Sequence, residues 1–316
     1  MQKYDELKFK GICSHGDYNK VIEYLESVDD ADEMLKKCRD IFEGGAYVLE
    51  TQDERIAEFL RCYEDFLKWA LTNETTTKEC KKQFVKRFRK FFPLSFTFMQ
   101  MYLRVGRFFK KKGYHVQFGI TLPYPALYLW GKQTTETRKV ELPEGSVEIE
   151  VCEMDEMIAS CWMTYLSLGI GGTGGWVTKK GCTYFKHKYD TASDEFNISL
   201  LKHEGQHFFD KKSYPKMKSA DLEYRAKLVE LIYYKDLKRL FTFLEDVSED
   251  AGRENPHKYA ATKIVRALSE RIFGKELETC RDLWTDEGEK VPAAALELLK
   301  EHSEKLKGRN GKSHII

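Results

Sequence analysis

The sequence predicts an α+β protein with a helical N-terminal region. Up to about residue 92, apolar side chains recur three and four positions apart, the period of helices that pack on one face. Residues 114–152 change to short runs rich in β-branched and aromatic residues, separated by Pro and Gly. From residue 219 onward the helical period returns. We therefore expect a helical accessory region over residues 1–113 and a second domain, built around a small mixed or antiparallel sheet, over residues 114–316.

Composition and charge favour a soluble intracellular protein. The 316 residues include 52 basic and 51 acidic side chains, so the net charge does not attract nucleic acid or an anionic membrane. The first residues are polar, unlike a signal peptide, and no stretch approaches the ~20 apolar residues that span a bilayer. The eight cysteines form no C-x-x-C pair, and we expect reduced thiols that pack as small hydrophobic side chains. We expect a cytoplasmic protein with no membrane partner.

The helical region is divided by turn-forming residues at 44–45 and 73–77, and it shows no repeat of fixed period. Within it, residues 81–92 are basic and place phenylalanines three and four apart. Such a helix suits a nucleic-acid or membrane surface. The same spacing describes an amphipathic helix that buries its phenylalanines and exposes its basic face to water, and we favour this second interpretation.

The elements expected in the second domain follow in order. We expect strands over residues 114–120, 126–130 and 146–151, separated by Pro123, Pro125, Gly131, Pro143 and Gly145, then a helix from Met154 to Leu168 and a strand through residues 182–185. The glycine-rich run from Gly169 to Gly175 matches no phosphate-binding motif. We interpret it as a loop beside a cleft, where a peptide can pair with the edge of a strand, and a turn without function is the alternative.

The most specific feature of the chain is the sequence His203-Glu204-Gly205-Gln206-His207, an H-E-x-x-H pattern in an apolar, helix-like run. Histidines four residues apart lie on the same face of a helix, so both rings can reach one metal ion. Glu204 lies beside them, where it can accept a proton from water at the metal. Ser193 or Asp194 is expected to cap this helix. Two packed core histidines on an ordinary helix are the alternative.

The motif and the order of elements around it resemble the catalytic core of the zincin metallopeptidases. The resemblance covers roughly residues 114–270 and rests on one strong motif together with a compatible order of strands, backing helix, strand and motif helix. It implies a zincin-like fold in which an edge strand precedes the motif helix and lines the substrate cleft. It also implies Zn²⁺ as the cofactor, with His203 and His207 as ligands and Glu204 as the general base.

A catalytic zinc usually takes three protein ligands and keeps a fourth position open. The metzincin subclass is excluded, because Ser213 stands where its third histidine would be and Asp210 where its glycine would be. Glu223 with Ala226 resembles the E-x-x-A of compact gluzincins, which supply a glutamate from a second helix. We therefore predict Glu223 as the third ligand. A solvated helix acid is the alternative for Glu223, and Asp210 is the rival ligand.

One position departs from the gluzincin pattern. Some members carry an aspartate four residues after the ligand glutamate, where it orients a histidine, and this chain has Lys227 there. Any carboxylate that orients a histidine must therefore come from elsewhere, and Asp210 and Glu230 are the candidates. We interpret Asp210 as such a partner, or as an exposed residue, rather than as a ligand.

A hydrolase of this type also benefits from a group that stabilises negative charge on the substrate oxygen. In gluzincins this group is often a His or Tyr downstream of the glutamate helix. His257 is our first candidate and Tyr259 the alternative, both near a loop-to-helix junction. An exposed loop histidine beside a buried tyrosine explains the same residues equally well.

The sequence therefore predicts a zinc-dependent peptidase of gluzincin type that acts on a peptide or protein substrate. The competing hypothesis is a zincin-like binding or regulatory protein with a structural or inactive zinc site. Nucleic-acid binding through residues 78–112 is a third and less favoured interpretation. The oligomeric state is left open.

Overall fold

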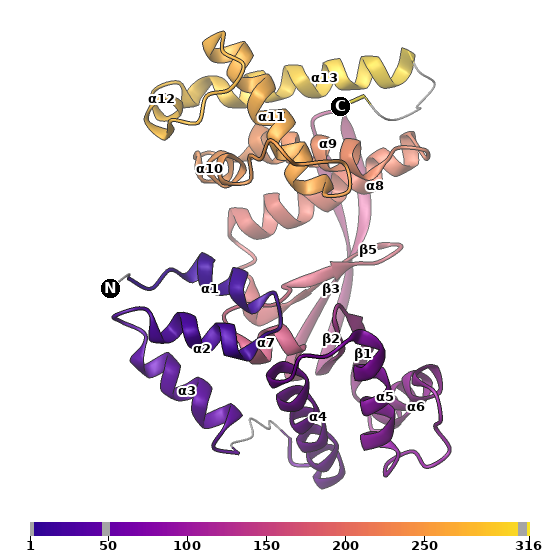
Figure 1. The fold of residues 1–316 in the computed structure, drawn as a ribbon. Coiled ribbons are helices and arrows are strands. Elements are labelled where there is room, and N and C mark those ends of the chain that lie inside the picture. The colour runs from indigo at the N-terminus through magenta and orange to yellow at the C-terminus, as the bar shows by residue number, and fades with distance from the viewer. Residues whose placement is uncertain (1–2, 46–50, 309–314) are drawn as a thin grey trace. The chain divides into compact units, whose positions relative to one another are not determined.

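The computed structural model describes residues 3–45, 51–308 and 315–316. It confirms an α+β fold, in which N-terminal helices precede a five-stranded mixed sheet and a helical C-terminal part follows (Figure 1). The chain forms two compact units. Unit 1 comprises residues 1–134 and 154–174, and unit 2 comprises residues 135–153 and 175–316. Within unit 1, strand β1 (His115–Thr121) packs against helix α6 (Phe98–Lys111). The expected division into an accessory region over residues 1–113 and a second domain stays a prediction.

Unit 1 is built from helices and from one end of a long hairpin. Its helices are α1 (Glu6–Cys13), α2 (Tyr18–Glu26), α3 (Asp32–Phe42), α4 (Glu54–Thr72), α5 (Thr77–Phe88), α6 (Phe98–Lys111) and the short α7 (Trp162–Leu166). Five of them begin at an Asp or Thr whose side chain accepts a hydrogen bond from a backbone N–H of the first turn. The expected helical character of this region and the break at residues 73–77 are confirmed.

A cluster of phenylalanines holds α4, α5 and α6 together. Phe84 and Phe88 of α5 are fully buried and stack at a ring-centroid distance of 4.0 Å. Phe59 of α4 contacts both Phe88 and Phe109 of α6. The favoured interpretation of the basic segment is thus confirmed for its phenylalanines, since they form core. Burying each ring stabilises the fold by about 1.5–3 kcal/mol.

The sheet contains two strands much longer than predicted. The strands are β1 (His115–Thr121), β2 (Tyr124–Leu142), β3 (Gly145–Ala159), β4 (Gly175–Val177) and β5 (Gly181–Phe185). Their order is β1-β2-β3-β5-β4, and β1 pairs antiparallel with β2, as β4 does with β5.

Two predictions about this sheet are wrong. Gly131 does not end a strand but lies inside β2, where a Cβ would come within 2.7 Å of Glu156 Oε2 on β3. The missing side chain therefore permits close approach of two strands rather than a break. The helix expected from Met154 to Leu168 is also wrong, because residues 154–159 continue β3 and only α7 is helical. Apolar residues fit either structure, and the pairing with β2 decides between them.

Unit 2 carries the H-E-x-x-H segment. After β4 and β5 it contains a π-helix (Glu195–Lys202), α8 (His203–Ser213), α9 (Ser219–Tyr233), α10 (Lys238–Glu245), α11 (Pro256–Phe273), α12 (Arg281–Asp286) and α13 (Val291–Gly308), with single 3-10 turns at Lys186–Lys188 and Gly288–Lys290. Its core joins side chains from the far end of the β2–β3 hairpin, from β5 and from these helices. Ser219 is the first residue of α9 and not its cap, because Lys218 takes that position without a side-chain bond.

The strand nearest to the motif in sequence is an interior strand. β5 lies between β3 and β4, and β4 forms the edge of the sheet. An edge strand therefore precedes the motif helix in the chain, with β5 between the two in sequence. β4 begins at Gly175, the end of the glycine-rich run, where a Cβ would lie 1.9 Å from the Thr183 carbonyl oxygen on β5. Within the run, Gly169 and Gly172 adopt positive φ values that favour glycine. Peptide pairing along this edge stays a prediction.

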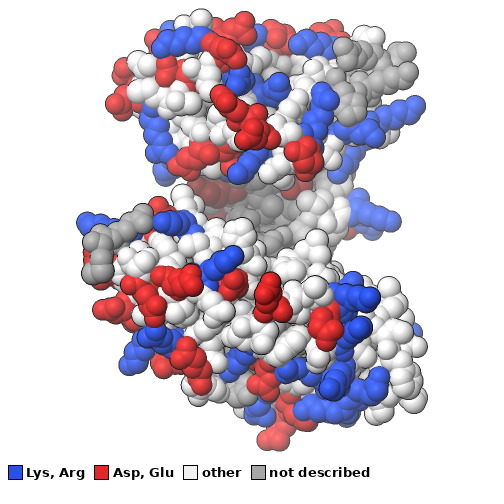
Figure 2. Space-filling model, in the orientation of Figure 1, with Lys and Arg blue, Asp and Glu red and all other residues white. Residues whose placement is uncertain are grey.

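The surface carries both charges. On the face shown in Figure 2, acidic and basic side chains are interspersed over the C-terminal helices, whereas Lys and Arg gather over α5 and α6. Seven of the eight cysteines are buried and none of the eight is in a disulfide, as predicted, and Cys280 is exposed. Among the described residues, no helix combines the length and the apolar character needed to cross a bilayer.

Candidate metal centre

The two motif histidines lie at the start of α8, directly after the π-helix. The helical segment begins near Ser193, whose Oγ accepts a hydrogen bond from the Phe196 N–H at 3.2 Å, so the expected start is confirmed. The π-helical geometry of residues 195–202 was not predicted. A π-helix widens the turn and commonly occurs beside functional sites.

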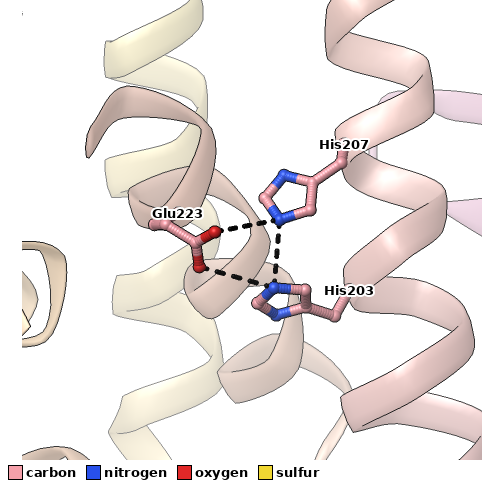
Figure 3. A group of neighbouring side chains, drawn as sticks. All are labelled: His203, His207 and Glu223. Carbon is pink, nitrogen blue, oxygen red and sulfur yellow. Dashed lines mark hydrogen bonds and ion pairs between the residues drawn. The ribbon is translucent and has the colours of Figure 1, made fainter. Parts of the chain in front are cut away.

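Three side chains bring donor atoms to one point (Figure 3). His203 Nε2 and His207 Nε2 are 3.1 Å apart. The Glu223 carboxylate, from α9, places Oε2 3.5 Å from His203 Nε2 and Oε1 3.3 Å from His207 Nε2. Both histidines are buried and Glu223 is nearly so. The structure thus brings together the two predicted histidine ligands and the predicted third ligand.

The donor set fits a zinc ion in both chemistry and spacing. Two ligands that lie 2.0–2.1 Å from a tetrahedral zinc are separated from each other by about 3.3 Å. The two ring nitrogens are 3.1 Å apart, and each has one of the two Glu223 oxygens at 3.3 or 3.5 Å. One donor atom from each of the three residues can be chosen so that all lie within 4.8 Å of one another. Among the described residues the group contains three potential ligands, so it is a candidate metal site.

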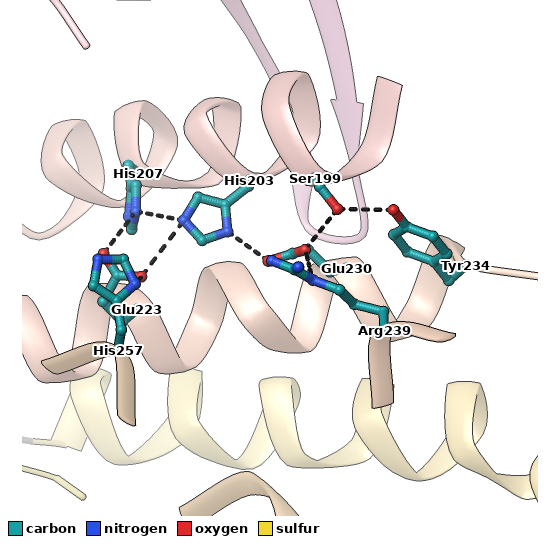
Figure 4. A network of polar contacts seen from close by, with 8 residues as sticks. All are labelled: Ser199, His203, His207, Glu223, Glu230, Tyr234, Arg239 and His257. Carbon is teal, nitrogen blue, oxygen red and sulfur yellow. Dashed lines mark hydrogen bonds and ion pairs between the residues drawn. The ribbon is translucent and has the colours of Figure 1, made fainter. Parts of the chain in front are cut away.

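Glu230 orients the first histidine from the side of its ring opposite His207 and Glu223 (Figure 4). Its Oε1 is 2.6 Å from His203 Nδ1, and its side chain is fully buried. An Nδ1–H bonded to this carboxylate leaves Nε2 of the same ring to face the metal. Ser199 Oγ donates to Glu230 Oε2 at 3.0 Å, Arg239 pairs with the same oxygen, and Tyr234 bonds Ser199 at 2.8 Å. Glu230 is therefore confirmed as the partner of a motif histidine.

The carboxylates set the protonation of the site. Burial alone would lower the pKa of His203, but its bonds to Glu223 and Glu230 outweigh burial and raise that pKa to about 9. Burial favours the neutral form of Glu223, yet the histidines around it hold the pKa of this carboxyl far below its usual range. The pKa of Glu230 is lowered in the same way, against its burial, by His203 and Arg239. Both carboxylates are therefore ionised and available to a cation.

Glu204, the acidic residue of the motif, takes no part in the ion pairs described above. Its Oε2 is buried and has no hydrogen-bond partner among the described residues. A carboxylate oxygen left without a partner costs free energy, so the position calls for a functional explanation. The next residue, Gly205, packs against strand β2: a Cβ there would lie 2.9 Å from Val140 Cγ1. The glycine thus lets the motif helix approach the sheet, a requirement that the sequence did not reveal.

The two candidates for charge stabilisation differ. His257, at the start of α11, places Nδ1 2.9 Å from Glu223 Oε2 while 63% of its side chain remains exposed. It therefore lies beside the donor group without belonging to it. Tyr259 is partly buried, and the charged groups of Arg253 and Lys263 approach its ring. The structure brings His257 to the site and gives Tyr259 no contact with the three donors.

Asp210 has neither of the roles expected for it. It is fully buried, and both of its oxygens accept hydrogen bonds from Arg225 Nε at 2.9 Å. Arg225 also donates to Ser303 of α13 at 2.7 Å and pairs with Glu144 in the hairpin turn. This buried cation therefore fastens α8, α9, α13 and the hairpin together. Neither a sequence motif nor a local period links these residues, so pattern reasoning missed them.

Lys227, the departure from the gluzincin pattern, is also buried. Its ammonium lies 4.2 Å from the centroid of the Phe243 ring, and burial lowers its pKa. His207 Nδ1 is buried without a hydrogen-bond partner among the described residues, so Glu230 serves only one of the two histidines. The site therefore has the three donor residues that were expected. It differs from the expected site at His207, because no carboxylate among the described residues bonds the Nδ1 of that ring.

Comparison with known proteins assigns this chain to no family. No protein-family model matches the chain, and neither a curated protein nor a solved structure is significantly similar to it. The candidate metal site thus rests on the geometry of His203, His207 and Glu223.

Proposed function

We propose that this protein is a zinc-dependent hydrolase of peptide bonds. The observation that carries the proposal is the convergence of His203, His207 and Glu223, which in the described part of the chain form a group of three potential ligands around one point. A zinc ion held by these residues would supply Lewis-acid chemistry, polarising a water molecule and the substrate carbonyl.

The remaining steps belong to the side chains around the donors. Glu204 accepts the proton of the attacking water and delivers it to the leaving amine, and its unpartnered buried oxygen supports this role. Glu230 keeps the His203 ring oriented through Nδ1. His257, exposed beside Glu223, is placed to donate a hydrogen bond to the developing charge on the substrate oxygen.

Metal analysis tests the ligands. The purified protein should hold one zinc per chain, and His203→Ala should lose it. His115→Ala, which changes a histidine of unit 1, is the matched control and should keep its zinc. Stoichiometric zinc in His203→Ala would contradict the assignment.

Peptide turnover tests the base. Glu204→Gln should retain zinc and reduce cleavage of a diverse peptide mixture, followed by mass spectrometry, by roughly 10²-fold or more. Glu195→Gln makes the same chemical change at an exposed position of the adjoining π-helix and should leave both zinc and cleavage unchanged. Cleavage at the wild-type rate in Glu204→Gln would eliminate the proposed base.

A zinc-binding protein without catalysis is the second candidate, and the position of His257 is the observation that favours it. Its Nδ1 lies 2.9 Å from Glu223, so a small side-chain rotation can bring a fourth ligand to the metal and close the site. His257→Ala distinguishes the two. A hydrolase keeps its zinc and loses turnover, whereas a structural site loses much of its affinity for zinc.

A further inference from the structure

Large apolar side chains are exposed together at one place in unit 1. Nine large hydrophobic residues are exposed in the described part of the chain, and five of them fall within residues 94–103. These five are Leu94 (66% exposed), Phe96 (63%), Met99 (66%), Tyr102 (40%) and Leu103 (50%), here called the 94–103 patch. Apolar surface gathered in this way usually marks a site of interaction.

The exposure follows the geometry of helix α6. Met101, Val105 and Phe109 lie on one face of the helix and are fully buried. Met99 and Leu103, four residues apart, lie on another face, and Arg107 and Lys110 continue it as exposed basic residues. One face of α6 therefore packs in the core while a second apolar face is presented to the surroundings.

Basic residues surround the patch. Residues 78–112 contain twelve Lys and Arg and one acidic residue, Glu79, which gives twelve minus one or +11, although the whole chain has a net charge of only +1. Some of these cations pair with carboxylates of α4 or its cap, as Lys90 does with Glu58. Only Lys90 and Lys112 form such pairs among the described residues. The other ten have no ion pair with a described residue: Lys78, Lys81, Lys82, Lys86, Arg87, Arg89, Arg104, Arg107, Lys110 and Lys111. Figure 2 shows Lys and Arg gathered over this region.

We propose that the 94–103 patch and its basic surroundings dock unit 1 on an anionic lipid bilayer. A bilayer interface accepts apolar side chains between its headgroups while its anionic lipids attract Lys and Arg, so it satisfies both features at once. Nucleic acid fits less well: bases can stack on Phe96 and Tyr102, but the aliphatic side chains of Leu94, Met99 and Leu103 offer no ring and would stay exposed. The balanced total charge of the chain conceals this local excess, and the membrane surface was the less favoured interpretation of the basic segment 81–92.

The association is peripheral and needs two contributions. Each basic residue at the surface of an anionic membrane strengthens binding roughly fivefold. The apolar side chains add the burial that makes binding persist when salt screens the charges. Removal of either contribution should therefore weaken binding, and removal of both should abolish it.

Sedimentation with vesicles tests the proposal on the full chain. The wild type should bind vesicles that contain about one third phosphatidylserine in phosphatidylcholine and should not bind pure phosphatidylcholine. Met99→Ser/Leu103→Ser and Arg107→Gln/Lys110→Gln should each reduce the partition coefficient by roughly tenfold or more. Circular dichroism and the Tm establish that each variant is folded.

Matched controls use equivalent changes elsewhere in unit 1. Leu7→Ser removes an equally exposed apolar side chain from α1, and Lys36→Gln/Lys37→Gln removes two exposed charges from α3. Both should bind vesicles as the wild type does. Equal binding by the patch variants and the wild type would overturn the proposal. So would tight binding of an oligonucleotide that depends on Arg107 and Lys110 but not on Met99 and Leu103, or a dimer in solution that the serine variant dissociates.

Discussion

Zinc must displace a proton from His203, and this competition can be measured. In the metal-free protein Glu223 and Glu230 overcome the effect of burial and raise the pKa of His203 to about 9. At pH 7 the ring therefore carries its second proton in about 99% of molecules, and at pH 9 in about half. Because the metal needs Nε2 without a proton, the apparent affinity for zinc should rise about tenfold per pH unit from 7 toward 9 and then level off.

The same shift affects the stability of the metal-free protein. A folded pKa of about 9, above the ordinary 6.5, means that the proton stabilises the fold below pH 6.5 and that this stabilisation is lost as the pH rises through 9. The loss is roughly 3 kcal/mol, from a shift of about 2.5 units at 1.36 kcal/mol each. The Tm of the metal-free protein should therefore fall between pH 6.5 and 9, and that of the zinc-loaded protein should fall less.

Calorimetry of zinc binding in buffers of different ionisation enthalpy gives the number of protons released. Glu230→Gln removes one of the two carboxylates that hold the proton, so at pH 8 it should release fewer protons per zinc than the wild type. Equal proton release by the two proteins at pH 8, or a zinc affinity that is constant between pH 7 and 8.5, would refute the reasoning.

Two further predictions concern packing around the site. Arg225→Met should lower the free energy of unfolding by about 3–5 kcal/mol in urea titrations, because it leaves the buried Asp210 without its cation, and Arg225→Met/Asp210→Leu should recover much of the loss. A loss below about 1 kcal/mol would be incompatible with the proposed fastening role. Gly205→Ala should lower the Tm, because overpacking against Val140 costs about 1–3 kcal/mol and exceeds the helix-propensity gain of about 1. In Gly205→Ala/Val140→Ala the two changes should compensate, and simple additivity would contradict the contact.

The parts of the site that sequence predicted are those set by local geometry or by a known motif. His203 and His207 share a helix face whatever the rest of the chain does. Glu223, on the next helix, was predicted from the resemblance of Glu223 and Ala226 to the gluzincin pattern and not from local geometry. The hydrogen bonds that join Arg225 to Asp210 and to Ser303 depend on the position of α13. A local sequence pattern holds no information about that position. Glu230 was one of two candidates because the pattern could not show which carboxylate would reach a ring nitrogen.

In the fold, too, the features set by neighbouring residues were predicted and those set by distant residues were not. The helices of unit 1 were predicted because apolar residues three and four positions apart are a local pattern that the sequence shows directly. The lengths of β2 and β3 were not, because each strand extends as far as its partner does and the pairing joins distant residues. Gly131 illustrates this, since glycine marks a turn in one context and a close approach of two strands in another.

The way the two units share the chain has a consequence for synthesis on the ribosome. The chain passes from one unit to the other after residues 134, 153 and 174. Unit 1 is complete only once residue 174 has left the ribosome. At that moment residues 135–153, which belong to unit 2, have already been synthesised, but the rest of unit 2, residues 175–316, has not. Neither unit can therefore be expressed by simple truncation. A genetic separation must reconnect residue 134 to 154, or residue 153 to 175, by a designed turn.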